Sequence, residues 1–163
     1  MTNPKDADLS RSQQLVPMQL QHIGQVSEIH QHINPSPWNL AQWQSCFENK
    51  AYQNWVIVES DAQSQRVVAF ACYLVMDVEA ELLNIGVAEQ NQGKGMGEAL
   101  LKSSLILLPE LTEQCFLEVR RSNLPAINLY QKLEFKQLSV RKNYYRHKSG
   151  VVEDALIYCK ALR

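Results

Sequence analysis

Residues Asn91–Leu101 read NQGKGMGEALL, and this stretch is the strongest indicator of the fold. Glycines occupy the alternate positions 93, 95 and 97, and the helix-forming run Glu98–Lys102 follows at once. Glycine is unfavourable in helix interiors because it loses more backbone freedom on folding than any other residue. The three glycines therefore predict a flexible turn at the start of a helix.

A glycine-lined helix start is suited to binding an anion. The first turn of a helix has free N–H groups and a partial positive charge, and glycines allow the backbone to approach a phosphate closely. The stretch fits neither the P-loop pattern nor the dinucleotide pattern G-x-G-x-x-G. It fits Q-x-x-G-x-G, formed by Gln92, Gly95 and Gly97. A plain strand-to-helix turn is the alternative, although three alternating glycines favour a diphosphate site.

Length and composition describe an ordinary globular chain. It has 163 residues, of which 45% are hydrophobic, and a net charge of -1. We expect a polar, flexible tail over residues 1–14 and one domain with a hydrophobic core over 15–163. The near-neutral charge gives no reason to expect direct nucleic-acid binding. No run of 18 apolar residues is present, so we expect no membrane span.

The cysteines and histidines indicate no metal site. The four cysteines are scattered without a C-x-x-C pair. Cys72, Cys115 and Cys159 lie in apolar runs, which is typical of reduced core thiols in a cytoplasmic protein. The histidines have no metal-ligand spacing, and we expect His30 and His32 to face solvent.

Hydrophobic patterning predicts alternating strands and helices, hence a mixed α/β (α+β) domain. The polar DAQSQ between the second and third strands suits a hairpin turn. The first half reads as antiparallel, and a strand–helix–strand crossover follows the glycines. Strands are expected at 15–20, 54–60, 66–78, 81–87, 115–119, 135–145 and 153–162, and helices at 23–33, 39–47, from the glycine stretch toward 108, and at 125–133.

Two motifs in this order resemble the GNAT acetyltransferase superfamily. The Q-x-x-G-x-G loop is similar to its acetyl-CoA pyrophosphate loop. The stretch LEVRRSNLPAINLYQKLEF, Leu117–Phe135, carries its N-x-x-A-x-x-L-Y signature, in which Asn123 is the first residue and Tyr130 the last. The resemblance runs from Leu15 to Leu162. It implies a mixed, mostly antiparallel central sheet of six to seven strands flanked by about four helices.

Two further stretches are similar to the RimI branch of that superfamily. They are RKNYY at Arg141–Tyr145, followed by G-x-x-E-D-A at 150–155, and SPWN at Ser36–Asn39. RimI enzymes acetylate the N-terminal alanine of a small-subunit ribosomal protein. The resemblance implies a cytoplasmic, metal-free enzyme that transfers acetyl from acetyl-CoA directly to the N-terminal amine of a ribosomal protein.

Such a transfer requires a base that deprotonates the amine and an acid that protonates the leaving thiolate. The resemblance assigns the base to Glu118, acting through water, and the acid to Tyr130. From the residues alone, Glu118 is equally compatible with a solvated strand face, and Tyr130 with a half-buried aromatic position. A direct transfer needs no nucleophilic Cys or Ser.

The resemblance also assigns binding residues. Acceptor residues would be Trp38, Tyr144 and Tyr145. From the residues, Asn123 is also compatible with a helix cap, and Glu153 and Asp154 with either a turn cap or a site for positive charge. The residues assigned to acetyl-CoA are Ile85, Gly86, Val87, Gln92, Gly93, Lys94, Gly95, Met96, Gly97, Glu98 and Asn123.

Two positions depart from the family pattern. Glu134 stands where a glycine commonly ends the preceding helix, and we expect it to strain or reshape that end. Gly86 replaces a more usual alanine and is expected to loosen its strand. Two other functions stay open: a GNAT enzyme acting on a lysine, polyamine or antibiotic amine, and a non-catalytic module that senses coenzyme A.

Overall fold

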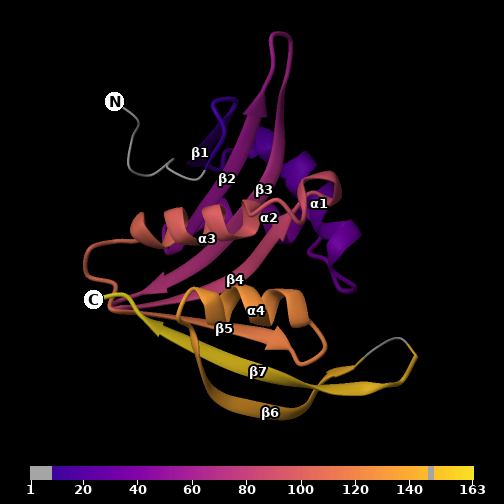
Figure 1. Ribbon diagram of the computed structural model, residues 1–163, viewed down its shortest axis with the longest axis vertical. Helices are drawn as coiled ribbons and strands as arrows, with labels where there is room; N and C mark the ends of the chain where they lie inside the picture. The colour runs from indigo at the N-terminus through magenta and orange to yellow at the C-terminus, as the bar shows by residue number, and fades with distance from the viewer. Residues whose placement is uncertain (1–8, 147–148) are drawn as a thin grey trace. The chain divides into compact units, whose positions relative to one another are not determined.

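The computed structural model describes residues 9–146 and 149–163. Seven strands in the described chain join in the order β1-β2-β3-β4-β5-β7-β6, and four α-helices accompany them (Figure 1). The mixed α/β prediction is confirmed. The elements are β1 (Gln13–Pro17), α1 (Ile23–Ile33), α2 (Leu40–Glu48), β2 (Tyr52–Ser60), β3 (Gln65–Met76), β4 (Glu79–Val87), α3 (Met96–Ile106), β5 (Gln114–Arg120), α4 (Leu124–Lys132), β6 (Lys136–Arg146) and β7 (Val152–Ala161), with short 3-10 turns at Leu20–His22 and Glu89–Asn91.

The described chain forms two compact units. The first contains 9–74 and Asn84–Leu108, and the second contains Val75–Leu83 and Pro109–Arg163. Residues 1–8 of the expected tail lie outside the described residues, whereas Gln13 and Gln14 belong to β1 and not to a tail.

The first unit is built on β3, which is covered by helices on both faces (Figure 1). Residues 67–73 are all buried, as expected for a strand covered on both sides. Phe70 packs edge-on against Trp43 of α2, with ring centroids 5.4 Å apart. Tyr73 points the other way, and its hydroxyl lies 2.7 Å from the Ser104 hydroxyl of α3. The apolar run of β3 is continuous because helices cover both faces of the strand.

Helix α2 begins where its sequence predicts. The Asn39 side chain accepts the Gln42 N–H at 2.9 Å, and the Gln42 side chain accepts the Asn39 N–H at 2.9 Å. This capping box satisfies two backbone donors that have no partner within the helix.

The second unit places β5 between β4 and β7. The β4–β5 pairing is parallel, from Glu79↔Gln114 to Leu82↔Leu117, and the β5–β7 pairing is antiparallel. The parallel pair confirms the predicted crossover. Helix α4 packs against β7, where the Gln131 amide donates to the Tyr158 hydroxyl at 3.4 Å. Strand β6 is the outer, mostly exposed strand of this unit.

The end of α4 adopts a Schellman motif with glutamate in the position that favours glycine. Glu134 has φ 67°. Its N–H donates to Gln131 O at 3.0 Å, and the Phe135 N–H donates to Tyr130 O at 2.9 Å. The Tyr130 and Phe135 rings then lie 5.9 Å apart. The expectation that Glu134 strains this end is confirmed, because a left-handed conformation is unfavourable for any residue with a Cβ.

Replacing Glu134 with Gly should stabilise the protein by about 1 kcal/mol, because glycine relieves this strain at a smaller cost in chain entropy. The Glu134–Lys160 pair that is lost, at 3.1 Å with Glu134 83% exposed, contributes little. Urea unfolding measures the difference. The matched control is Glu134→Ala, which removes the ion pair but keeps the strain. Equal stability of Glu134→Gly and Glu134→Ala would contradict the assignment of backbone strain to position 134.

Candidate active site

The glycine stretch forms a turn that ends in the first turn of α3. Gly93 and Gly95 have φ of 71° and 78°, and Gly95 is the N-cap residue of the helix. The Gln92 amide donates to Val87 O at 3.0 Å, and Lys94 Nζ donates to Gln90 O at 2.7 Å. These bonds tie the turn back to the end of β4.

This turn leaves space for a ligand at the helix N-terminus. The first helical hydrogen bond runs from Ala99 N to Gly95 O at 3.0 Å, so the N–H groups of Met96 and Gly97 precede it. A Cβ built on Gly93 or Gly95 would meet no atom within 4 Å. Gly97 lies in the first turn of α3, so it is not one of the left-handed residues. The local geometry fits an anionic group.

Gly86 has a packing role that its sequence context did not indicate. A Cβ at this position would lie 2.5 Å from Cε1 of Phe70, whose side chain is fully buried, and would also collide with Ile33. Glycine therefore allows the Phe70 ring to lie directly against the β4 backbone between Ile85 and Val87.

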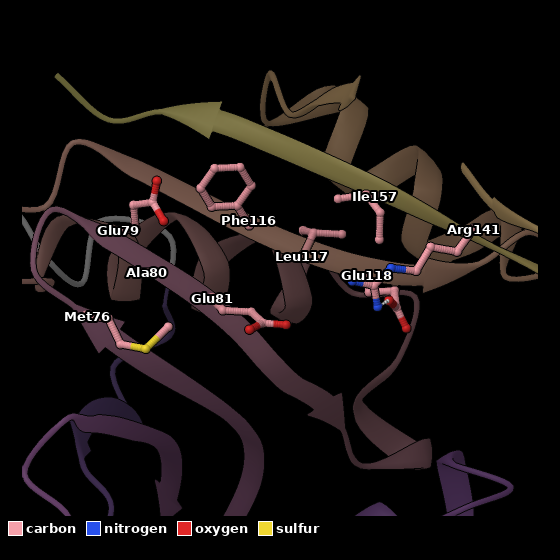
Figure 2. A pocket seen from close by; sticks show the side chains of 9 residues that line it. All are labelled: Met76, Glu79, Ala80, Glu81, Phe116, Leu117, Glu118, Arg141 and Ile157. Atoms are coloured by element: carbon pink, nitrogen blue, oxygen red, sulfur yellow. Dashed lines mark hydrogen bonds and ion pairs between the residues drawn. The ribbon is translucent and has the colours of Figure 1, made fainter. Parts of the chain in front are cut away.

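The second unit holds Glu118 in a pocket on one face of its strands (Figure 2). The side chain is 18% exposed. Its Oε1 accepts the Tyr145 hydroxyl at 2.9 Å, and its Oε2 pairs with Arg141 Nη1 at 3.0 Å. Glu118 is one residue beyond the last β4–β5 pair, Leu82↔Leu117. The pocket is lined by Glu79 and Glu81 of β4, Phe116 and Glu118 of β5, Arg141 of β6, and Ile157 of β7, among others.

Tyr130 lies on the other face of β5. Burial on β5 alternates, with Leu117 and Val119 buried and Glu118 half-buried, and Tyr130 reaches β5 from α4 near Cys115. Tyr130 is buried, not half-buried as one reading of the sequence suggested. Burial raises the pKa of its hydroxyl, so it remains a proton donor at neutral pH. The structure shows Glu118 and Tyr130 on opposite faces of one strand.

Tyr145 of β6 contacts Glu118, and Tyr144 packs against Tyr145. Their rings lie edge to face with centroids 5.2 Å apart. The Arg141 guanidinium lies 5.2 Å from the Tyr144 ring, and the Arg120 guanidinium 4.6 Å from the Tyr145 ring. In the sequence, Arg141 is notable only as the first residue of RKNYY. Its four-residue spacing from Tyr145 places both on one strand face, but only the register of β6 and β7 shows that this face is that of Glu118.

Remaining polar candidates have local structural partners. Asn123 caps α4, where its Oδ1 accepts the Ala126 N–H at 3.3 Å, so the helix-cap reading is confirmed. Glu153 accepts the Ser122 N–H at 3.0 Å, and Asp154 accepts the Asn143 N–H at 2.9 Å. The turn-cap reading is confirmed for Glu153, because Ser122 lies in a turn, whereas the partner of Asp154 lies in β6.

Trp38 lies in an aromatic group of the first unit around His30. The ring of Trp38 is 4.8 Å from that of Trp43, and the Trp38 main-chain N–H donates to His30 Nδ1 at 3.3 Å. His30 is 1% exposed, so its predicted solvent-facing position is wrong, whereas His32 is exposed. Phe70, Trp38 and Trp43 surround His30, so the face of α1 that carries His30 is buried against these rings.

The acetyltransferase (GNAT) family matches residues 20–135 of the chain. The chain belongs to this family. A ribosomal protein bS18-alanine N-acetyltransferase of Haemophilus influenzae is 36% identical over 132 residues, which are 80% of this chain and 86% of that protein. The resemblance to the RimI branch is thereby confirmed.

Solved structures agree with this GNAT assignment. The crystal structure of the ribosomal-protein-S18-alanine N-acetyltransferase from Escherichia coli has a TM-score of 0.80 and 30% identity, covering 92% of this chain and 94% of that one. The structure of Arabidopsis thaliana NAA60 in complex with acetyl-CoA has a TM-score of 0.80 at 18% identity, covering 91% and 98%, and shows a common fold.

The cysteines of this GNAT chain are free: Cys46, Cys72 and Cys115 are buried, and Cys159 is half-buried, less covered than predicted. Within 9–146 and 149–163, no three His, Cys, Asp or Glu side chains gather as a metal site requires; His147 lies outside the described residues. No helix in this part of the chain is long and apolar enough to cross a membrane.

The buried His30 should make stability depend on pH. Burial lowers its pKa from 6.5 to about 4, while the Asn84 side chain acts in the opposite direction. Between these values the unfolded state binds more protons, so stability falls as pH falls from 6.5 to about 4. The loss is about 3 kcal/mol.

Urea unfolding between pH 7 and pH 4 tests this expectation, with His30→Gln showing the smaller loss. The exposed His32→Gln is the control and should follow the wild type. The pKa of His22 is also lowered by burial, but that residue is present in every protein compared. Identical pH slopes for His30→Gln and the wild type would contradict the assignment.

Proposed function

We propose that this GNAT enzyme transfers an acetyl group from acetyl-CoA to the N-terminal alanine amine of a ribosomal protein in the cytoplasm. The observation that carries the proposal is Glu118, a carboxylate in a pocket whose oxygens are held by Tyr145 and Arg141. The names of its relatives supply the acceptor, ribosomal protein bS18. One catalytic domain that begins with β1 at Gln13 and a metal-free reaction belong to the same proposal.

The glycine turn is the binding site proposed for the diphosphate of acetyl-CoA. Its support is the left-handed pair Gly93 and Gly95, the open space above both, and the N–H groups of Met96 and Gly97. Helix N-termini of this form bind phosphate through backbone donors and the helix dipole. The backbone of Ile85–Val87 is proposed to pair with the pantetheine arm. These β4 residues follow the segment that pairs with β5, which ends at Leu82.

Glu118 and Tyr130 would divide the proton transfers. Glu118 accepts one proton of the ammonium through water, the resulting neutral amine forms a C–N bond with the thioester carbon, and the C–S bond breaks. The Tyr130 hydroxyl protonates the departing thiolate, and the second proton that the nitrogen loses returns through solvent to the tyrosinate. An α-amino group, with a pKa of roughly 7.7–8.0, is deprotonated near neutral pH more readily than a lysine at about 10.4. An N-terminal acceptor is therefore the less demanding substrate.

Acceptor profiling tests this function. Purified protein with acetyl-CoA should acetylate peptides that begin with Ala, such as the N-terminal peptide of ribosomal protein bS18, and mass spectrometry should place the acetyl group on the α-amine. Peptides that begin with Ser or Met, and a blocked peptide with an internal lysine, complete the set. Acetylation of the lysine peptide alone would refute the proposal in favour of another amine. Binding of acetyl-CoA without turnover would indicate a sensor.

Glu118→Gln and Tyr130→Phe should each lower kcat by about 100-fold or more, because each removes one proton-transfer group without changing side-chain shape. The KM for acetyl-CoA should change little. Steady-state kinetics against both substrates measures the two constants. The control is Asp61→Asn, a carboxylate of the β2–β3 turn whose oxygens accept from the Gln63 and Ser64 N–H groups and the Ser64 hydroxyl. Parallel losses of acetyl-CoA affinity and rate would count against the assigned roles.

A further inference from the structure

The pairing of β6 with β7 shifts register twice, and the second shift lies between Arg141 and Tyr145, the two residues whose side chains reach Glu118. Arg141 pairs with Ala155 and Tyr145 pairs with Glu153, so three residues of β6, 142–144, stand opposite the single residue Asp154. Asn143, in the middle, has φ 54°. This β-bulge inserts two extra residues into β6. Bulges of this kind bend a strand and re-aim its side chains, often beside active sites.

The bulge determines where Tyr145 lies along the strand. In an uninterrupted ladder, Asn143 would stand opposite Glu153, and Tyr145 would lie two residues farther along. At 3.3–3.4 Å per residue that displacement is about 7 Å, far beyond a hydrogen bond of 2.9 Å to Glu118. Two inserted residues also preserve the alternation of faces, so Tyr145 stays on the face of Glu118.

Asp154 holds the bulge in place. Its Oδ1 accepts the Asn143 N–H at 2.9 Å, and its Oδ2 pairs with Arg121 at 3.1 Å and Lys142 at 3.3 Å. The Arg121 N–H also donates to the Asp154 carbonyl at 3.1 Å. The Asn143 N–H bond, followed by Lys142 and Arg121, holds the pKa of Asp154 below its usual value. The carboxylate therefore remains charged at neutral pH and satisfies the backbone donor that the bulge frees.

Tyr145 and Arg141 differ in how firmly they can hold Glu118. The Arg141 side chain is 58% exposed, and the Tyr145 side chain is half-buried under the Arg120 guanidinium. Burial and the adjacent Glu118 charge raise the pKa of Tyr145, so its hydroxyl stays a donor. A partly buried hydrogen bond to a carboxylate is stronger and better fixed than an exposed ion pair.

We propose that Tyr145, held by the Asp154-anchored bulge, is a positioning residue that fixes Oε1 of Glu118, so that Oε2, whose partner Arg141 is largely exposed, accepts the proton of the acceptor amine through water. This role rests on the proposed function only in requiring Glu118 as the base for some amine. It is distinct from any contact of the Tyr145 ring with the acceptor, because it depends on the hydroxyl.

Tyr145→Phe separates these two roles, because it removes the hydroxyl and keeps the ring. The variant should lower kcat roughly tenfold, the size expected for one hydrogen bond to a charged group, with the KM for acceptor and acetyl-CoA within twofold. The control Tyr52→Phe removes a hydroxyl from β2, outside the site, and should retain the wild-type kcat. An unchanged kcat in Tyr145→Phe, or a rise in acceptor KM alone, would overturn the proposal.

The bulge is tested through Asn143 and Asp154. Asn143→Val, which disfavours a left-handed φ, should lower kcat more than Asn143→Gly, which accepts it. Asp154→Ala should lower kcat in the wild type but add little to Tyr145→Phe, because it acts through the same hydroxyl. Additive losses from Asp154→Ala and Tyr145→Phe, or equal effects of Val and Gly, would show that the bulge does not act through Tyr145.

A measurement that does not depend on turnover tests the Tyr145–Glu118 contact whatever the acceptor amine is. If the wild type acetylates another amine, the N-terminal alanine proposal fails, and the kinetic comparison uses that amine. If it acetylates none, urea unfolding of Glu118→Gln, Tyr145→Phe and the double variant still reports their contact. The double variant should shift the unfolding midpoint by less than the sum of the single shifts. Additive shifts would refute the positioning contact.

Discussion

A carboxylate in an apolar strand must be compensated by hydrogen bonds or counter-charges, because an unpaired charge out of water costs several kcal/mol. Glu118 meets this constraint with one partner on each oxygen, Tyr145 and Arg141. Both partners come from β6, which does not pair directly with β5. The position of β6 relative to β7 therefore determines whether both oxygens of Glu118 have partners in the pocket.

Structural and chemical roles overlap in the second unit. The Schellman motif that ends α4 uses Tyr130 O as an acceptor and sets the Tyr130 ring beside Phe135. The bulge anchored by Asp154 sets the position of Tyr145. Each motif contains a non-glycine residue with positive φ, Glu134 in one and Asn143 in the other. Strained backbone of this kind persists where surrounding contacts outweigh its cost.

In the first unit, close packing of aromatic rings holds the side chains in position, whereas in the second unit hydrogen bonds do so. Phe70 lies directly against the backbone of Gly86, and His30 fills the space between Phe70 and the two tryptophans. Membership of the GNAT family accounts for the order of elements. Family membership does not by itself account for the aromatic group around His30. Within that group, the main-chain N–H of Trp38 donates a hydrogen bond to the His30 ring.

The sequence by itself determined the elements, their order and the glycine turn, because hydrophobic period, the Asn39 cap and glycine spacing are local signals. Only the tertiary structure decided that His30 is buried, that Gly86 makes room for Phe70, and that Arg141 and Tyr145 meet Glu118. These facts depend on which residues of distant segments stand opposite one another. A two-residue bulge held by Asp154 changes the register of β6 against β7. Because two residues keep the alternation of faces, the hydrophobic pattern of the sequence does not reveal the bulge.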